Sequence, residues 1–382
     1  MFECKLPLAL QGYKAAQMGI IFLVLVITGC ATTPTGDVES SEPIFYPALP
    51  EPPRIQYLTT FNSSMDVDTG NAEFASFVLG KDLGKDAYFI DKPYGVQIHE
   101  GKLYVVDTRG PGYAVFDLVN QEFNMVLGDG GGRMQKPINI SFDKDGGRYI
   151  SDTGSNKVLV FDSNDRFIKA YGFSDQFKPT DTAISGNKLF VVDVKDHEIE
   201  VLNKETGLLL YKIGKEGPEE GQFLHPTNLK IGVDNHLYVT DTSNFRVQKF
   251  TQEGEFVQQF GSIGDSLGQL SRPKGIALDR HNNLYVVDAA FENVQILNPE
   301  GQLLLYFGTP GTWPDSINLP ADIEIDYDNV ELFQGYAHPD FELEYIILVS
   351  SQFGANKVNV YGFGKMKGVE YLDDEALSSA NK

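Results

Sequence analysis

The side chains best suited to chemistry in this 382-residue chain are basic residues that stand immediately before five of six regularly spaced prolines, from Pro93 to Pro320. The prolines are separated by 44, 42, 47, 47 and 47 residues. The residues that precede them are Lys92, Lys136, Lys178, His225, Arg272 and Leu319. If the six copies surround one axis, four firm positive charges and a titratable histidine converge there and attract an anion, a carboxylate or an acidic peptide. The alternative is that each cation pairs with an acid of a neighbouring copy.

A second set of residues stands two positions after the same prolines. Its members are Gly95, Asn139, Asp181, Asn228, Gly275 and Asp322. Two carboxylates and two amides that converge on an axis would offer the oxygen ligands that calcium prefers. The alternative is that Asn139, Asp181, Asn228 and Asp322 only line a wet channel. The six histidines occupy different places in their copies, so the sequence shows no three-histidine pattern for zinc.

An aspartate recurs about fifteen residues after the proline in five copies and is replaced by Gln352 in the last. The five aspartates are Asp107, Asp152, Asp193, Asp241 and Asp288. A side chain needed once in each copy is expected to serve local geometry, by accepting hydrogen bonds from backbone amides of the turn that follows. The sequence also shows no nucleophile elbow, haem-attachment motif, phosphate loop or dinucleotide fingerprint, and we assign no catalytic residue.

The elements that position these residues are short strands. Each proline is followed by an alternating segment such as 275–278, then a turn rich in Asp, Asn and Gly, then a second strand such as 284–287. A third strand and a fourth, such as 246–250 and 256–261, complete each copy. The alternation and the polar turns exclude helices. Four strands per unit, at a period in the forties, predict an all-β fold, a six-bladed β-propeller.

The copies resemble NHL repeats, most plainly at residues 225–247, which read HPTNLKIGVDNHLYVTDTSNFRV. The resemblance covers residues 55–364 and implies a propeller of six blades. Related propellers include calcium-dependent lactonases and a zinc-dependent amidating lyase. The resemblance therefore also implies an alternative function, a metal-dependent hydrolase or lyase with its site at the channel mouth.

The last copy supplies only three strands, at 321–326, 344–350 and 357–362, so residues 54–61 are expected to pair with it and close the ring. The propeller then covers residues 54–364 and a charged tail covers 365–382. Two insertions interrupt it, at 62–92, with an apolar patch at 74–80, and at 326–344. Such long loops serve either recognition or local packing that caps the ring.

The first 29 residues have the layout of a signal peptide, with Lys5 and Lys14 before an apolar run at 19–27. The run is about half the length of a membrane span. The tetrapeptide Ile27-Thr28-Gly29-Cys30 resembles a lipobox, which implies that Cys30 becomes a lipid-bearing N-terminus. The alternative is an ordinary cleaved signal with an incidental cysteine. Residues 30–53 are then a flexible tether, and Ala31 favours the outer membrane by resemblance to Gram-negative lipoproteins.

The net charge of −22, which becomes −23 once the leader is removed, excludes nucleic acid as a partner. We therefore expect a lipid-anchored binding or scaffold protein of the cell envelope, most consistent with an outer-membrane position facing the periplasm. Its partners would be a protein, a peptide or an envelope component, and the membrane through the lipid on Cys30. No cofactor is identified from the sequence, and calcium is the one metal that the polar set allows.

Overall fold

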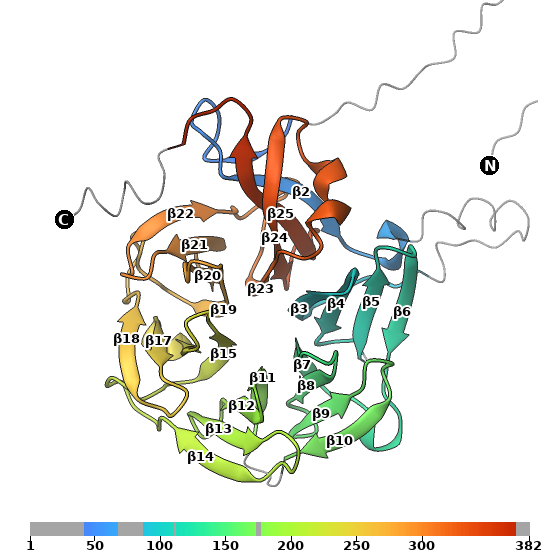
Figure 1. Ribbon diagram of the computed structural model, residues 1–382, viewed down its shortest axis with the longest axis vertical. Coiled ribbons are helices and arrows are strands. Elements are labelled where there is room, and N and C mark those ends of the chain that lie inside the picture. Colours follow the sequence, from blue (N-terminus) through green and yellow to red (C-terminus); the bar gives the residue numbers. More distant parts are fainter. Residues whose placement is uncertain (1–41, 68–86, 111, 173–176, 372–382) are drawn as a thin grey trace, which may run out of the picture. The chain divides into compact units, whose positions relative to one another are not determined.

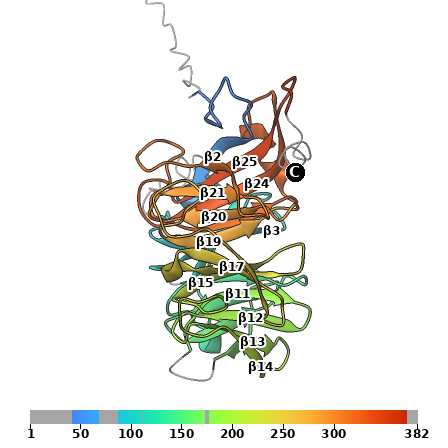
Figure 2. The ribbon, with the colours of Figure 1, turned by 90° about the vertical axis from the view of Figure 1, so that its left-hand side faces the viewer.

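The computed structural model describes residues 42–67, 87–110, 112–172 and 177–371. Within the unit Pro43–Lys382, six antiparallel sheets surround a common axis, which confirms the predicted six-bladed β-propeller (Figure 1). Figure 2 shows the same ring edge-on. Among the described residues, no helix is long and apolar enough to span a membrane.

Each of the first five blades consists of four consecutive strands, numbered from the inner strand outward. The first two blades contain β3 (Pro93–His99), β4 (Lys102–Asp107), β5 (Tyr113–Asp117), β6 (Glu122–Val126), β7 (Pro137–Phe142), β8 (Arg148–Asp152), β9 (Lys157–Phe161) and β10 (Phe167–Tyr171). The next two contain β11 (Pro179–Ser185), β12 (Lys188–Asp193), β13 (Glu198–Asn203), β14 (Leu209–Ile213), β15 (Pro226–Ile231), β16 (Leu237–Asp241), β17 (Arg246–Phe250) and β18 (Phe256–Phe260). The fifth contains β19 (Pro273–Leu278), β20 (Leu284–Asp288), β21 (Asn293–Leu297) and β22 (Leu303–Phe307).

The hydrophobic core lies between neighbouring blades, because successive side chains of a strand point to opposite faces of its sheet. In β16, Leu237 and Val239 pack with residues of the third blade, whereas Tyr238 packs with residues of the fifth. Both faces of each blade are therefore buried. Every inner strand begins at a repeat proline, so the residues that precede these prolines lie at one end of the ring, which we call the proline end.

The sixth blade is closed by the N-terminal strand, as predicted. Its strands are β23 (Pro320–Asp326), β24 (Phe341–Ser351), β25 (Val358–Met366), β2 (Ile55–Phe61) and β1 (Phe45–Tyr46). β2 pairs antiparallel with β25, from Ile55 opposite Phe363 to Phe61 opposite Val358. The ends of β24 and β25 extend beyond the predicted strands, so the ordered blade includes residues 341–343 and reaches Met366.

The predicted tether at 30–53 is too long, because β1 belongs to the folded blade. Phe45 is buried and its ring lies 5.6 Å from that of Phe341, between centroids. The Tyr46 hydroxyl donates a hydrogen bond to Asp315. Two aromatic side chains that pack on the ring fix this segment despite the prolines around it. The leader, Cys30 and the apolar patch at 74–80 lie outside the described residues.

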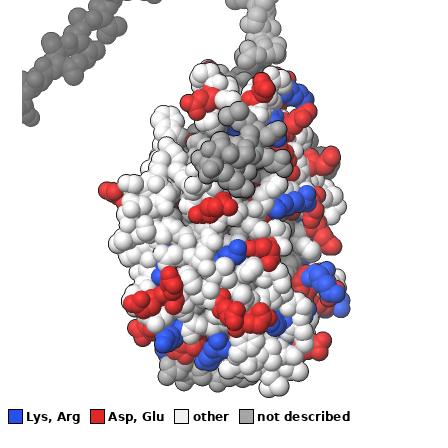
Figure 3. Space-filling view, turned by 60° about the vertical axis from the view of Figure 1, so that its left-hand side comes forward, with Lys and Arg blue, Asp and Glu red and all other residues white. Residues whose placement is uncertain are grey.

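The insertion between β23 and β24 packs locally. It contains two short 3-10 helices, Val330–Leu332 and Gln334–Tyr336. Phe333, between them, is 2% exposed and joins a core cluster with Phe61 and Phe116, which lie in β2 and the first blade. This contact supports the capping role that the sequence left open for this insertion. On the side of the molecule drawn in Figure 3, acidic and basic side chains are interspersed.

Candidate functional site

The repeated aspartates organise the proline end. The Asp107 carboxylate accepts hydrogen bonds from the amides of Asp91 (2.7 Å), Lys92 (3.1 Å) and Arg109 (3.0 Å). Asp152, Asp193 and Asp288 bind amides at equivalent places. Each thus ties the residue before a repeat proline to the turn after the second strand. The prediction that these aspartates serve blade geometry is confirmed.

The five predicted ligand-binding residues all lie at the proline end, each at the start of a different inner strand. Lys136, Lys178, His225 and Arg272 are exposed, and Lys92 is half-buried. The His225 imidazole lies beside Ser243, with Nδ1 3.2 Å from the hydroxyl oxygen, and its ring is 4.7 Å from that of His197. None of the four Lys and Arg side chains forms an ion pair with an acid in the described part of the chain.

Lys92 and Arg272 both repel the ammonium of a residue that the sequence reasoning missed, Lys274, which stands two residues after Arg272. Lys274 is the second residue of β19 and is 7% exposed. Its ammonium donates a hydrogen bond to Gln352 Oε1 at 3.3 Å and lies 5.6 Å from the Tyr94 ring centroid. Burial, followed by repulsion from Arg272 and Lys92, lowers the pKa of Lys274 to about 8.

Two aromatic residues complete this arrangement. Lys92 Nζ lies 5.3 Å from the ring centroid of Phe353, which is 50% exposed. The cationic cluster, as we call it, consists of Lys92, Tyr94, Arg272, Lys274, Gln352 and Phe353. The lysine and arginine charges come from the first and fifth blades, while the sixth contributes an amide and an aromatic ring. Within the described parts of the chain, no hydrogen bond, ion pair or ring contact joins Lys136, Lys178 or His225 to Lys274.

The prediction that Gln352 replaces the repeated aspartate in the last blade is wrong by one residue, because the irregular register of β23 and β24 pairs Pro320 with Ser351, and Gln352 comes next. In the other blades, the aspartate that pairs with the repeat proline accepts a hydrogen bond from the amide of the residue before or two before that proline. Ser351 does this in the sixth blade, where its hydroxyl accepts from the amide of Asn318 at 3.3 Å. In the sixth, the amide of Leu319 instead donates to Glu292 Oε1 of the fifth blade, at 2.8 Å. The absence of the repeated aspartate from the last copy was the one sequence signal that pointed toward the cationic cluster.

Beneath the cationic cluster, Tyr94 closes off a layer of polar side chains. Its hydroxyl donates to Asn228 Oδ1 at 3.0 Å, and Asn228 Nδ2 donates to Asp322 Oδ1 at 3.4 Å. Burial, followed by the charges of Asp322 and Asp181, raises the pKa of Tyr94, so the phenol stays protonated. The inner strands approach closely here, since a Cβ on Gly95 would lie 2.3 Å from Asn139 Oδ1.

The four predicted calcium ligands do not form an open set of oxygens. Asp181 accepts hydrogen bonds from the amides of Thr182 and Leu229, at 2.8 and 3.0 Å. Asn139 Oδ1 accepts from the amide that follows it, and Asp322 Oδ2 accepts from the amide of Val96. The described residues include no group of three or more His, Cys, Asp or Glu that is arranged to hold a metal. These oxygens therefore do not fit a calcium site.

An ammonium group balances the charge of this layer. Lys230 Nζ lies 2.6 Å from Glu324 Oε2, which also accepts from Gln97 Nε2 at 2.6 Å. Burial raises the pKa of Asp181, with a further contribution from Asp322, and Lys230 opposes both effects. The attraction of Glu324 and the two aspartates outweighs burial and raises the pKa of Lys230. Lys230 therefore supplies the positive charge that a metal would bring.

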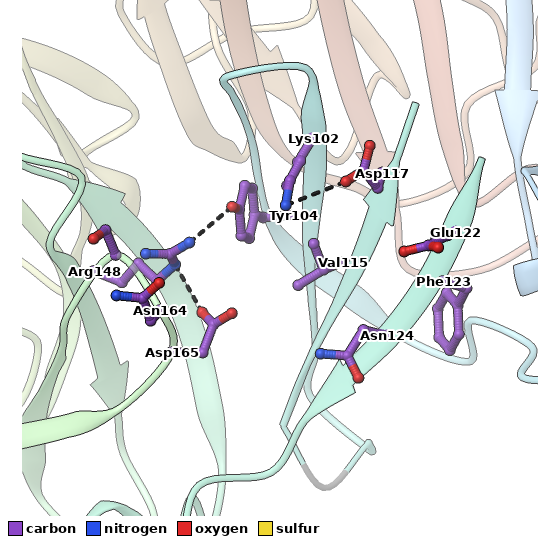
Figure 4. Close-up of a pocket in the computed structure, with 11 residues that line it drawn as sticks. Lys102, Tyr104, Val115, Asp117, Glu122, Phe123, Asn124, Arg148, Asn164 and Asp165 are labelled. Atoms are coloured by element: carbon purple, nitrogen blue, oxygen red, sulfur yellow. Dashed lines mark hydrogen bonds and ion pairs between the residues drawn. The ribbon is translucent and has the colours of Figure 1, made fainter. Parts of the chain in front are cut away.

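A separate cavity of about 370 Å³ lies between the first and second blades (Figure 4). Its cations are already paired. Arg148 Nε lies 2.8 Å from Asp165 and Nη2 donates to the Tyr104 hydroxyl, while Lys102 lies 3.2 Å from Asp117. The cavity thus lacks the uncompensated positive charge that distinguishes the cationic cluster.

Comparisons with known proteins agree with the fold. The NHL repeat model matches residues 223–250. The brain tumor protein of Drosophila melanogaster is 43% identical over 49 residues, which are 13% of this chain and 5% of that protein. A Caenorhabditis elegans protein named as a peptidyl-alpha-hydroxyglycine alpha-amidating lyase is 23% identical over 124 residues, which are 31% of this chain and 34% of that one. The matches thus span well under half of these relatives.

Solved structures show the same architecture at low identity. An auxiliary nutrient binding protein from Bacteroides thetaiotaomicron has a TM-score of 0.54 and 12% identity, with 73% of this chain and 70% of that chain covered. A gluconolactonase from Xanthomonas campestris has a TM-score of 0.52 and 15% identity, with 72% and 86% covered. The class is therefore defined: the protein is a six-bladed β-propeller. Within that class, it carries an NHL repeat.

Proposed function

We propose that the protein is a lipid-anchored binding protein of the bacterial cell envelope, and that its cationic cluster holds an anionic group of a protein, peptide or envelope ligand. The observation that carries this proposal is the charge of the cluster. Lys92, Arg272 and Lys274 lie together, and none is ion-paired with an acid in the described ranges. A bound carboxylate would relieve their mutual repulsion through charge-assisted hydrogen bonds.

The surroundings favour a ligand that joins a carboxylate to an apolar part. Phe353 is half exposed beside Lys92, and Trp313 is 70% exposed. Asn356, three residues after Phe353, donates a hydrogen bond to the carbonyl oxygen of Trp313 at 2.8 Å. Exposed aromatic rings beside a charged site are typical of surfaces that bind peptides and proteins.

A metal-dependent hydrolase or lyase has less support from the geometry, because the oxygens expected to bind calcium already accept hydrogen bonds from the chain.

The sequence of the leader supports the proposal of a lipid anchor at Cys30. With a net charge of −23 after removal of the leader, attraction to anionic lipids would not hold the protein at a membrane, so attachment would depend on the lipid at Cys30.

The binding proposal is tested by calorimetric titration of the purified chain with lactate, a small carboxylate. Arg272→Glu is expected to weaken lactate binding by at least about tenfold, or about 1.4 kcal/mol, because it reverses one of three clustered charges. Lys144→Glu is the matched control, since Lys144 is exposed in the turn at the other end of β7. Equal losses in both variants would show that lactate responds only to net charge and would overturn the proposal.

A further inference from the structure

Lys274 differs from the half-buried Lys230, which also lies on an inner strand, in what its amine contacts. Lys230 forms an ion pair with Glu324, which keeps its amine protonated, so the nitrogen has no lone pair available for reaction. Lys274 donates a hydrogen bond to the neutral amide oxygen of Gln352 and lies against the Tyr94 ring. A lysine that is desolvated and lies beside other cations gives up its proton readily and becomes a nucleophile.

We propose that Lys274 captures small carbonyl compounds that carry a carboxylate, as a covalent imine. The inference rests on the proposed anion site, because Arg272 and Lys92 would hold the carboxylate while the amine meets the adjacent carbonyl carbon. A keto acid or an aldehyde acid supplies both groups within a few atoms. Lys274 is only 7% exposed to solvent, and this limited access selects small molecules.

The chemistry requires no oxidant and no further reactant. The Nζ lone pair of Lys274 forms a bond to the carbonyl carbon, and the carbonyl π electrons move to its oxygen, which takes up a proton. The resulting carbinolamine loses that oxygen as water, with both hydrogens of the neutral amine leaving nitrogen in the process. One amine and one carbonyl thus give one imine and one water. The lowered pKa of Lys274, about 8, supplies neutral amine under mild conditions.

Gln352 is the residue that keeps this amine available. Gln352 follows Ser351, which pairs with Pro320 where the other blades pair an aspartate with the repeat proline, and its neutral amide oxygen lies 3.3 Å from Lys274 Nζ. A carboxylate there would form an ion pair at the same distance and would stabilise the ammonium form. Gln352→Glu changes only the charge of this side chain and so is the sharpest variant for the test.

The test is reductive trapping of the full chain with glyoxylate and cyanoborohydride at pH 8, followed by peptide mapping. We expect adduct formation at Lys274 at least about tenfold faster than at the exposed Lys144. Lys274→Arg should abolish that adduct, and Gln352→Glu should slow it by at least about tenfold. If Lys274→Arg fails to fold, the adduct rates in the wild-type chain and in Gln352→Glu still test the inference. Modification of Lys274 no faster than Lys144 would overturn the inference.

Two further probes separate this inference from the anion site on which it rests. Lactate has the carboxylate but no carbonyl to attack, and propanal has the carbonyl but no charge. Lactate binding without trapping of glyoxylate at Lys274 would overturn the imine and leave the anion site intact. Equal trapping rates with propanal and glyoxylate would support a reactive amine and overturn the role of Arg272 and Lys92 as an anion site.

Discussion

Two lysines of the inner strands, the half-buried Lys230 and the buried Lys274, show how placement decides what a side chain does. Lys230 lies among carboxylates and is held as a counter-ion, whereas Lys274 lies among cations and amides. Both follow a repeat proline by a few residues, Lys274 by one and Lys230 by four. The offset from the proline therefore decides whether a residue reaches the cationic cluster or the polar layer below it.

The first prediction at this scale concerns pH. Lys274 is charged below its pKa of about 8 and neutral above it, so the affinity for lactate should fall as pH rises through that value. Bound lactate favours the ammonium form, which moves the loss to a higher pH in the complex. The groups that face Lys274 are Arg272, Lys92, Tyr94 and Gln352; burial raises the pKa of Tyr94, so its phenol stays neutral near pH 8.

Calorimetric titrations between pH 6.5 and 9.5 measure this dependence. In Lys274→Met the affinity for lactate should be weaker and nearly constant over the same range. A wild-type profile as flat as that of the variant would contradict the assignment of Lys274 to the anion site.

At the level of single residues, the sequence predicts the site only in part. It places five side chains at one end of the ring correctly, because the proline fixes where each inner strand begins. It cannot show that Lys92 and Arg272 converge on Lys274, since that requires the first, fifth and sixth blades to be in place. Nor can it show that Asp181 and Asp322 already accept backbone hydrogen bonds.

Among the elements, β2 has the largest consequence for the fold. It joins the first described part of the chain to β25 and buries Ile55 completely. The period of the repeats predicts this strand because the last copy lacks a partner. The short strand β1 could not be predicted from the sequence, because its two residues stand among prolines and show no alternating pattern. Aromatic rings that are distant in the sequence hold it in place.

Truncation of Ile55 tests the closure. Ile55→Ala should lower the free energy of unfolding by about 2–5 kcal/mol, because it removes a fully buried side chain from a packed core. Thr59→Ala, on the partly exposed part of the same strand, should cost less than about 1 kcal/mol. Denaturant unfolding of both variants measures the difference. Equal stabilities would mean that β2 does not hold the ring together.

Taken as a whole molecule, the chain combines a closed ring with a leader that resembles that of a lipoprotein. Closure pairs β25 with β2, so the last blade gains its outer strand from the segment after the proposed anchor. The six-fold repeat made this architecture predictable from the sequence. The ligand is not predictable in this way, because one fold supports many functions.

The anchor is tested by Cys30→Ala in a bacterial expression host. The wild-type chain should incorporate labelled palmitate and sediment with membranes, and the variant should do neither, because the acylated thiol is missing. A Cys4→Ala chain is the control and should behave as the wild type. Membrane association that survives in Cys30→Ala would rule out lipidation at this residue as the means of attachment.

The central claim is that three cations without an acidic partner form an anion site, and Gln352→Glu tests it most directly by adding one acid beside them. The measurement is calorimetric titration of the wild-type chain and of Gln352→Glu with lactate at pH 7. We predict binding to one site per chain in the wild type and affinity at least about tenfold weaker in the variant. No binding in the wild type, or equal affinities, would contradict the claim.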